Sequence, residues 1–155
     1  RSIVDMSVET MARLSKITNI VGVKDATNDL ARPVYTRLAS GSDFCQLSGE
    51  DGTVAAFLAQ GGDGCISVTG NVAPGPCSQL HEAWQSRDLD NFAVLRDRLA
   101  PLNLALFCES SPGPVKYAAS LLDKCLPDTR LPLVPIADTS KQQLREAMVS
   151  SGLLN

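Results

Sequence analysis

The sequence lacks the charge clusters and long apolar runs that mark several large classes of protein. No run of like charge exceeds two residues and the formal net charge is -3, so the Lys and Arg clusters that bind phosphate backbones are missing and nucleic acid is not an expected partner. No stretch approaches the roughly 18 apolar residues of a membrane span, and the opening RSIVDMSVET lacks the layout of a signal peptide. We therefore expect a cytoplasmic protein without a membrane partner.

Cysteine, histidine and aromatic residues are also sparse. The five cysteines are odd in number and form no CxxC pair, which favours reduced, mostly buried thiols over a disulfide framework or a zinc site. His81 is the only histidine and falls in a helical pattern, so neither a metal cluster nor a Ser-His-Asp triad is indicated. Aromatic residues make up 5% of the chain and are too scattered to suggest a cofactor-binding surface.

Short apolar runs alternate with helical patterns in the first half of the chain. A helical pattern comes first, with apolar residues at Val8, Met11 and Leu14. The apolar runs predict three strands, at 19–24, 44–48 and 64–68, and the segments between them predict helices at 30–40 and 53–60. Short apolar strands separated by helices of about ten residues are typical of βαβ units and a parallel sheet. An α/β fold is therefore expected.

The second half of the chain predicts helices alone. The segment LPLVPI at 131–136 is too rich in proline for a central strand. Ser140 and Gln143 match a capping box, which predicts the start of a last helix that ends near Gly152. The sequence pattern therefore divides the chain into an α/β part that holds the predicted strands and a C-terminal helical layer.

Three parallel strands followed by four helices would leave sheet edges that a small protein must cover. The sequence holds no internal repeat, low-complexity tract or linker that would cover them, and it has no initiator Met. The simplest expectation is that the chain is the C-terminal part of a larger protein.

The carboxyl ends of the predicted strands carry the candidate chemistry, because ligands of parallel α/β folds bind there. Lys24 follows the apolar run IVGV, so its stem is expected in apolar surroundings. Desolvation of an ammonium favours the neutral amine, which can form a Schiff base with a ketone or aldehyde. Two plainer interpretations stay open at this point: Lys24 as a solvated or ion-paired side chain, and Glu50 with Asp51 as charges that favour a helix N-terminus.

Four segments of the sequence carry a resemblance to a known family: NIVGVKDAT, QLSGEDGT, GGDGCISVTGNVAP and FCESSPGPVKYA. In this order they closely resemble the C-terminal half of dihydrodipicolinate synthase, also called 4-hydroxy-tetrahydrodipicolinate synthase, a pyruvate-dependent class I aldolase. The resemblance implies strands 6–8 of a (β/α)8 TIM barrel over residues 1–76, and the final barrel helix with a C-terminal helical region over residues 77–155. Members of the family are usually homotetramers. It also implies the condensation of pyruvate with aspartate semialdehyde on the route to lysine, without a metal or organic cofactor.

The resemblance implies roles for five residues of this sequence. Lys24 falls on the lysine that forms the pyruvate imine, Arg1 on the arginine that binds the semialdehyde carboxylate, and Gly49 on the glycine of the SGxD turn. Ile66 and Val68 fall on the eighth-strand residues that border the imine. The family's paired threonines and its two tyrosines have no counterpart among these residues, so we expect half of an aldolase site, completed by a missing N-terminal half of the barrel.

Two alternative functions stay open beside the synthase. One is a related pyruvate aldolase or lyase, of the 2-keto-3-deoxy sugar acid or N-acetylneuraminate type. The other is a catalytically dead scaffold or association module whose helices still pack against partners. Only a competent lysine site would gain irreversible mass from pyruvate and borohydride, so that reaction separates the two kinds of protein.

Overall fold

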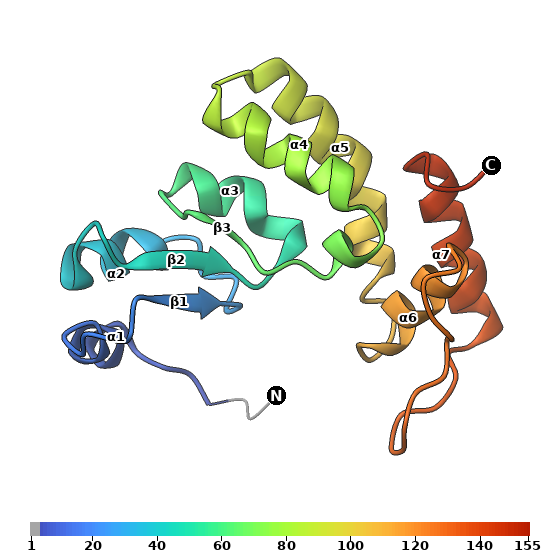
Figure 1. The fold of residues 1–155 in the computed structure, drawn as a ribbon, viewed down its shortest axis with the longest axis horizontal. Coiled ribbons are helices and arrows are strands. Elements are labelled where there is room, and N and C mark those ends of the chain that lie inside the picture. The colour runs from blue at the N-terminus through green and yellow to red at the C-terminus, as the bar shows by residue number, and fades with distance from the viewer. Residues whose placement is uncertain (1–3) are drawn as a thin grey trace. The chain divides into compact units, whose positions relative to one another are not determined.

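A computed structural model describes residues 4–155 of the chain (Figure 1). The chain forms two compact units, of which the first ends at Ser67 and the second begins at Val68. The described residues form seven α-helices, two short 3₁₀ turns and one small parallel sheet. The expected α/β class is therefore confirmed.

The first unit holds the whole sheet, in the strand order β1-β2-β3, with both neighbouring pairs parallel. Its elements are α1 (Val8–Leu14), β1 (Gly22–Asp25), α2 (Arg32–Ser40), β2 (Cys45–Ser48), η1 (Asp51–Thr53), α3 (Val54–Ala59) and β3 (Gly64–Cys65). The three predicted strands are thus present, each shorter than its apolar run. The largest difference is at β3, which ends at Cys65, whereas the predicted strand extends to residue 68. Val68 has helical backbone angles, with φ -81° and ψ -43°.

The pairing register separates the two faces of the sheet. Lys24 pairs with Leu47, and Leu47 with Gly64, so these three residues share one face. Gln46 lies on the opposite face, where it is buried and its Nε2 donates to the carbonyl oxygen of Pro33 at 3.0 Å. Because Pro33 belongs to α2, that helix covers the face opposite Lys24.

The ends of the first two helices follow from local sequence. Ser7 precedes α1 in an extended conformation, and its hydroxyl accepts a hydrogen bond from the Thr10 amide, which satisfies one donor of the first turn. Pro33 lies in the first turn of α2, where no amide donor is needed. α2 then ends at Gly41, whose φ of +94° is a conformation that favours glycine.

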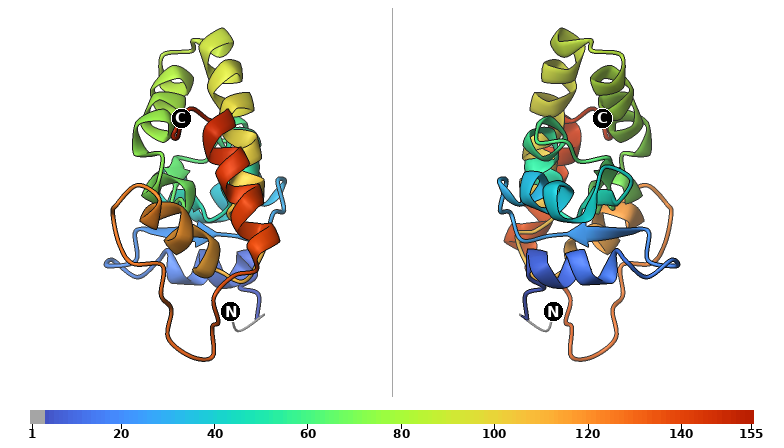
Figure 2. Two further views of the ribbon diagram at one scale, coloured as in Figure 1. Left: turned by 90° about the vertical axis from the view of Figure 1, so that its right-hand side faces the viewer. Right: turned by 90° about the vertical axis from the view of Figure 1, so that its left-hand side faces the viewer.

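All the regular secondary structure of the second unit is helical in the part of the chain that the structure describes. Its elements are η2 (Thr69–Asn71), α4 (Pro74–Gln85), α5 (Leu89–Ala105), α6 (Gly113–Ser120) and α7 (Asp138–Ser150). α5 packs against both α4 and α7, as two views of the ribbon show (Figure 2). Leu102, Leu106, Leu144 and Met148 are fully buried between these helices and form the centre of one apolar core.

The start of α7 differs from the prediction. The helix begins at Asp138 after Ala137, so Ser140 and Gln143 lie inside it, and the predicted capping box is wrong. The carboxylate of Glu109 supplies the cap instead, because its Oε1 accepts from the Ala137 amide at 2.8 Å. A second hydrogen bond, from the Ser140 hydroxyl, and this amide bond hold the pKa of Glu109 below its usual 4.5. A distant side chain has taken the place of the local cap.

The cysteines are less buried than the sequence suggested. Cys45, Cys65, Cys77 and Cys108 are half-buried and Cys125 is exposed, so the expectation of mostly buried thiols is wrong. None of the described helices combines the length and the apolar character needed to cross a membrane.

Candidate functional site

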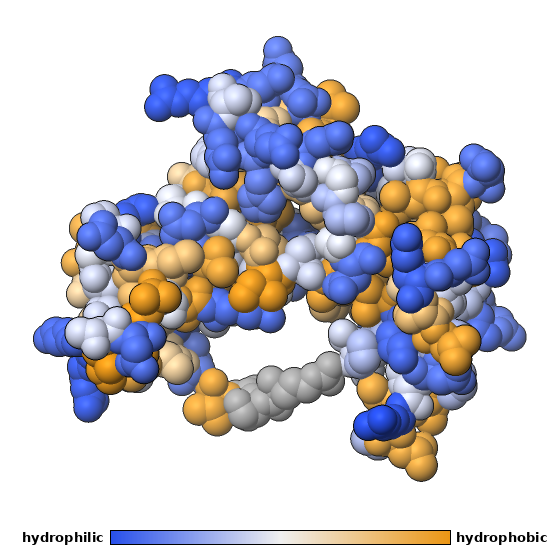
Figure 3. Space-filling view, viewed as in Figure 1, coloured by the Kyte–Doolittle hydropathy of each residue, from blue (hydrophilic) through white to orange (hydrophobic). Residues whose placement is uncertain are grey.

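Lys24 lies in β1 on the sheet face that α2 leaves open. Its neighbours on this face are apolar or small: Gly22 on its own strand, and Cys45 and Leu47 on β2. The space-filling view shows hydrophobic surface over the strands of the first unit (Figure 3). The side chain of Lys24 is exposed, so its amine is accessible in apolar surroundings.

A shallow concavity of about 430 Å³ runs along this face. Its lining is mostly apolar and consists of Asn19, Ile20, Val21, Gly22, Val23, Lys24, Cys45, Leu47 and Ile66. Lys24 supplies the one amine of that lining, beside the half-buried thiol of Cys45. A small ketone held here would therefore meet a single amine with which it can form a Schiff base.

Gly49 lies directly against the side chain of Lys24. A Cβ atom built on Gly49 would be 2.8 Å from Cε of Lys24 and 2.7 Å from Cβ of Ala26, closer than real Cβ atoms approach. The Gly49 amide also donates to the carbonyl oxygen of Asp25 at 2.7 Å, which continues the parallel ladder beyond β2. Gly49 thus lets the lysine stem cross over the end of the neighbouring strand.

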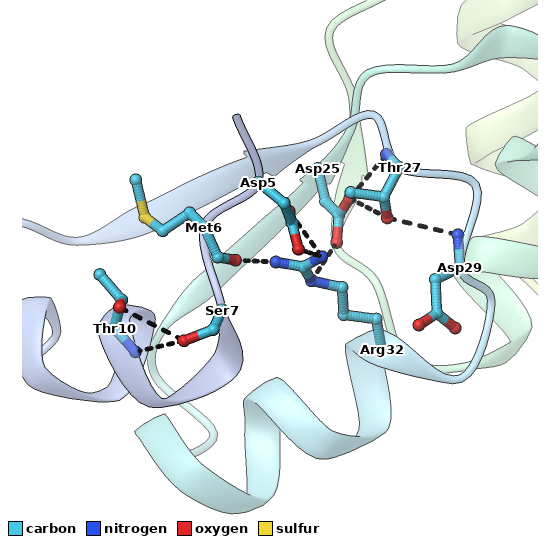
Figure 4. A network of polar contacts seen from close by, with 8 residues as sticks. All are labelled: Asp5, Met6, Ser7, Thr10, Asp25, Thr27, Asp29 and Arg32. Atoms are coloured by element: carbon cyan, nitrogen blue, oxygen red, sulfur yellow. Dashed lines mark hydrogen bonds and ion pairs between the residues drawn. The ribbon is translucent and has the colours of Figure 1, made fainter. Parts of the chain in front are cut away.

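The loop after Lys24 is held by its own polar side chains (Figure 4). Oδ1 of Asp25 accepts from both the amide and the hydroxyl of Thr27, at 2.9 and 2.7 Å. The Thr27 hydroxyl oxygen accepts from the Asp29 amide at 3.3 Å. These bonds form the turn that an Asp followed two residues later by Thr favours.

Arg32, at the start of α2, joins this loop to the segment before α1 (Figure 4). Its Nη1 donates to both carboxylate oxygens of Asp5 at 2.9 Å, and its Nη2 donates to the Met6 carbonyl. Its Nε lies 3.4 Å from Oδ2 of Asp25. The guanidinium is therefore flanked by two carboxylates, one of which belongs to the residue after Lys24.

The loop after β2 carries a second polar cluster. The side chain of Glu50 accepts from the Gly52 amide at 3.1 Å and caps η1, which confirms the plainer interpretation of this acid as a helix-start charge. Asp51 is buried and accepts a hydrogen bond from the Ser67 hydroxyl. Asp51 thus ties the loop after β2 to the segment after β3.

The structure brings together three of the residues that the sequence singled out. Lys24 and Gly49 are in contact, and Ile66 lines the same concavity, although it lies just beyond β3 and not within a strand. Val68 belongs to the second unit, where it precedes η2. Arg1 lies outside the described residues. Among residues 4–155, no group of three or more His, Cys, Asp or Glu side chains is placed to hold a metal ion.

Three residues to which the sequence assigned no functional role adjoin the site: Asp25, Thr27 and Arg32. The Asp-x-Thr spacing of Asp25 and Thr27 was a readable signal for a turn, but it pointed to local structure only. Arg32 carried no signal, because its partners lie seven and 27 positions away along the chain.

These features define a class of protein: an α/β protein with an accessible lysine at the carboxyl end of a parallel strand, on an open apolar face. The model of the Dihydrodipicolinate synthetase family matches residues 1–151, and the chain belongs to this family. The resemblance read from the GVKDAT and SGED segments is thereby confirmed.

Relatives of similar sequence are 4-hydroxy-tetrahydrodipicolinate synthases. The one from Rhodospirillum centenum is 64% identical over 154 residues, and the one from Gluconacetobacter diazotrophicus is 56% identical over 156 residues. They match 99% and 100% of this chain, which covers 53% and 52% of their own lengths. The chain thus spans about half the length of the curated relatives it matches.

Solved structures of dihydrodipicolinate synthases have the same fold over the matched part. A monomeric variant superposes with a TM-score of 0.94 at 37% identity over 99% of this chain and 53% of its own. The protein from Thermotoga maritima superposes with a TM-score of 0.89 at 38% sequence identity, over 95% of this chain and 51% of its own. The chloride-inhibited synthase from Acinetobacter baumannii, solved with pyruvate, superposes with a TM-score of 0.90 at 37% sequence identity, over 97% of this chain and 52% of its own.

Proposed function

We propose that the polypeptide that carries this chain condenses pyruvate with aspartate semialdehyde to give 4-hydroxy-tetrahydrodipicolinate, through an imine formed on Lys24. The observation that carries the proposal is the position of Lys24, accessible on an apolar face with its stem against Gly49. Membership in the Dihydrodipicolinate synthetase family supports the choice of reaction, and pyruvate in the Acinetobacter baumannii structure supports the choice of the first substrate.

Lys24 would act as nucleophile and electron sink. Its amine attacks the keto carbon of pyruvate, and the carbonyl oxygen leaves as water when the imine forms. The protonated C=N bond withdraws electrons, so a methyl proton is lost to a base and an enamine forms. The enamine carbon then bonds to the aldehyde carbon of the second substrate, whose oxygen takes up a proton. Attack of the product's own amino group on the imine closes the ring and frees Lys24.

Several parts of the proposal rest on the family resemblance. They are the carboxylate-binding role of Arg1, the placement of Ile66 and Val68 beside the imine, a homotetrameric assembly in the cytoplasm, and chemistry without a metal or organic cofactor. The groups that bind the pyruvate carboxylate and move protons would come from the N-terminal half of the barrel.

Borohydride trapping followed by peptide mapping tests the proposal. Pyruvate and borohydride should add irreversible mass to the peptide that contains Lys24, and Lys24→Arg should abolish the label, because a guanidinium stays protonated and does not attack. Lys16→Arg is the matched control, since Lys16 is an exposed lysine outside the concavity. Label on another lysine, or none at all, would contradict the proposal, and the absence of label would favour a dead scaffold.

The acceptor is tested separately, through Arg1. The planar donor fork of arginine suits a carboxylate. Arg1→Ala should therefore raise KM for the semialdehyde far more than KM for pyruvate. An equal rise for both substrates would argue for a structural role of Arg1. Cleavage of a 2-keto-3-deoxy sugar acid in place of the condensation would assign the chain to the related aldolases.

A further inference from the structure

We infer that Arg32 is a positioning residue for Lys24, acting through the carboxylate of Asp25. This inference rests on the proposed role of Lys24 and adds a residue to it. Arg32 lies on α2 on the covered side of the sheet, and it contacts the residue next to the nucleophile and not the nucleophile itself. Three features of the contact support the assignment.

The first feature is the alternation of β1. Lys24 and Asp25 are consecutive strand residues, so their side chains point to opposite faces of the sheet. A roll or slip of the strand that released Asp25 from the covered face would turn Lys24 away from the open face. Whatever holds Asp25 therefore holds Lys24 against Gly49.

The second feature is that both oxygens of Asp25 are engaged. Oδ1 takes the two hydrogen bonds from Thr27, and Oδ2 is left for the Arg32 guanidinium, at 3.4 Å. The side chain of Asp25 is 8% exposed and that of Arg32 is 10% exposed. Water therefore screens this ion pair less than it screens a surface pair. Removal of Arg32 would leave a nearly buried carboxylate with one oxygen unpaired.

The third feature is the anchoring of Arg32 on its far side. Nη1 donates to both carboxylate oxygens of Asp5, whose side chain is 62% exposed, and Nη2 donates to the Met6 carbonyl. Nε makes no hydrogen bond within the described residues, so its contact with Asp25 is an ion pair at longer range. The planar fork is thus fixed by the segment before α1 and presents its remaining edge to Asp25. Such a geometry requires arginine, since lysine has one charged centre to share between two acids.

Arg37 provides a matched control on the same helix. Its guanidinium also ties α2 to a distant segment, with Nη1 donating to the Gly61 carbonyl and Nη2 to the Gln60 carbonyl, both at 2.9 Å. Both arginines thus connect elements of the first unit, but only Arg32 contacts the residue that follows Lys24. Substitution of Arg37 therefore measures the cost of a lost structural arginine without a link to the nucleophile.

The experiment measures the rate of pyruvate trapping on Lys24 in the full-length polypeptide, at a series of pyruvate concentrations. Arg32→Met should lower the rate at saturating pyruvate by about tenfold or more, a loss expected of a misplaced nucleophile. The half-saturating concentration should change far less. Arg32→Lys should restore part of the rate, and Arg37→Met should stay within about twofold of the unsubstituted protein.

Three outcomes overturn the inference. One is an unchanged saturating rate in Arg32→Met, and another is an equal loss in Arg37→Met. The third applies if both Arg32 variants fail to fold: Asp5→Asn, at an exposed position, should then slow trapping by a smaller factor, and no effect would count against the inference. Failure of the proposed function is distinguishable, because the unsubstituted protein would then show no label on Lys24.

Discussion

The two units of the chain bury polar side chains to different extents. Beside apolar residues such as Phe57, the first unit buries the polar residues Arg32, Gln46, Ser48 and Asp51, and it leaves apolar surface open on one face of its sheet. The second unit surrounds α5 with a continuous apolar core. The candidate chemistry therefore lies in the first unit, on the sheet face that α2 leaves open.

The difference has an energetic basis. Burial of apolar side chains stabilises a fold in proportion to the area removed from water, so the core around Leu102 and Leu144 is a direct source of stability. A buried polar group adds little net stability, because it exchanges water for a protein partner. A buried polar group nevertheless needs hydrogen-bond partners at defined positions, because a buried group without a partner is costly. The buried polar residues of the first unit thus specify the positions of the loops that follow β1 and β2.

The largest expected effect is on the second unit. Leu102→Ala should lower the free energy of unfolding by about 2–5 kcal/mol, because Leu102 is 0% exposed at the centre of the core. Leu104→Ala is the control, since Leu104 lies on the same helix and is 73% exposed. Denaturant unfolding checks both variants. Equal losses would mean that the apolar core does not dominate the stability of this unit.

The next expected effect is on the site, at Gly49. The added Cβ of Gly49→Ala would lie 2.8 Å from Cε of Lys24 and 2.7 Å from Cβ of Ala26, so the lysine stem and the chain beyond β1 must both shift. We expect trapping of pyruvate to slow by roughly tenfold to a hundredfold. Gly75→Ala is the control, because a Cβ at Gly75 meets nothing within 4 Å. Unchanged trapping in Gly49→Ala would show that the contact with Lys24 is dispensable.

A smaller loss of stability is expected from Glu109→Ala, which removes the cap of α7. The pKa of Glu109 is lowered in the folded state, so its contribution is present above pH 4.5 and is lost as the pH falls through the folded value. The melting temperatures of the variant and the unsubstituted protein should therefore differ at neutral pH and converge in acid. A difference in melting temperature that persisted unchanged in acid would contradict this assignment.

The smallest effect is expected from the half-buried His81 on α4. Burial lowers the pKa of its imidazole below 6.5, so the unfolded chain binds a proton more readily than the folded one. Stability should be complete above pH 6.5 and decline as the pH falls through the folded value. His81→Gln should remove this part of the pH dependence in unfolding experiments. Because His81 is the only histidine, a residual decline near pH 6.5 would have another origin.

Much of the fold was predictable because it depends on local patterns. The apolar spacing of Val8, Met11 and Leu14 corresponds to α1, and the run that ends at Lys24 corresponds to β1. Lys24 and Gly49 could be placed at one end of the sheet, because the carboxyl ends of parallel strands meet there. Periodicity and strand direction were sufficient for these elements.

Contacts between distant residues were not predictable in the same way. Nothing close to Arg32 in the sequence indicates that it contacts Asp5 and Asp25, and nothing close to Ala137 indicates that Glu109 caps α7. Ser140 and Gln143 have the spacing of a capping box, which depends on local sequence alone. The amide at the start of α7, that of Ala137, instead donates to the carboxylate of Glu109, 28 positions away. The end of β3 was also misjudged, since an apolar run does not mark where pairing stops.

β1 has a neighbour on one side only within the described sheet, because the strand order places it at an edge. In an edge strand, about every second amide points away from the sheet and exchanges its hydrogen with solvent without waiting for unfolding. The strand that carries Lys24 should therefore show faster amide hydrogen exchange than β2, which is paired on both sides. A chain segment that pairs with the outer edge of β1 would slow that exchange. Amide exchange in β1 thus reports directly whether the sheet has been extended next to the lysine.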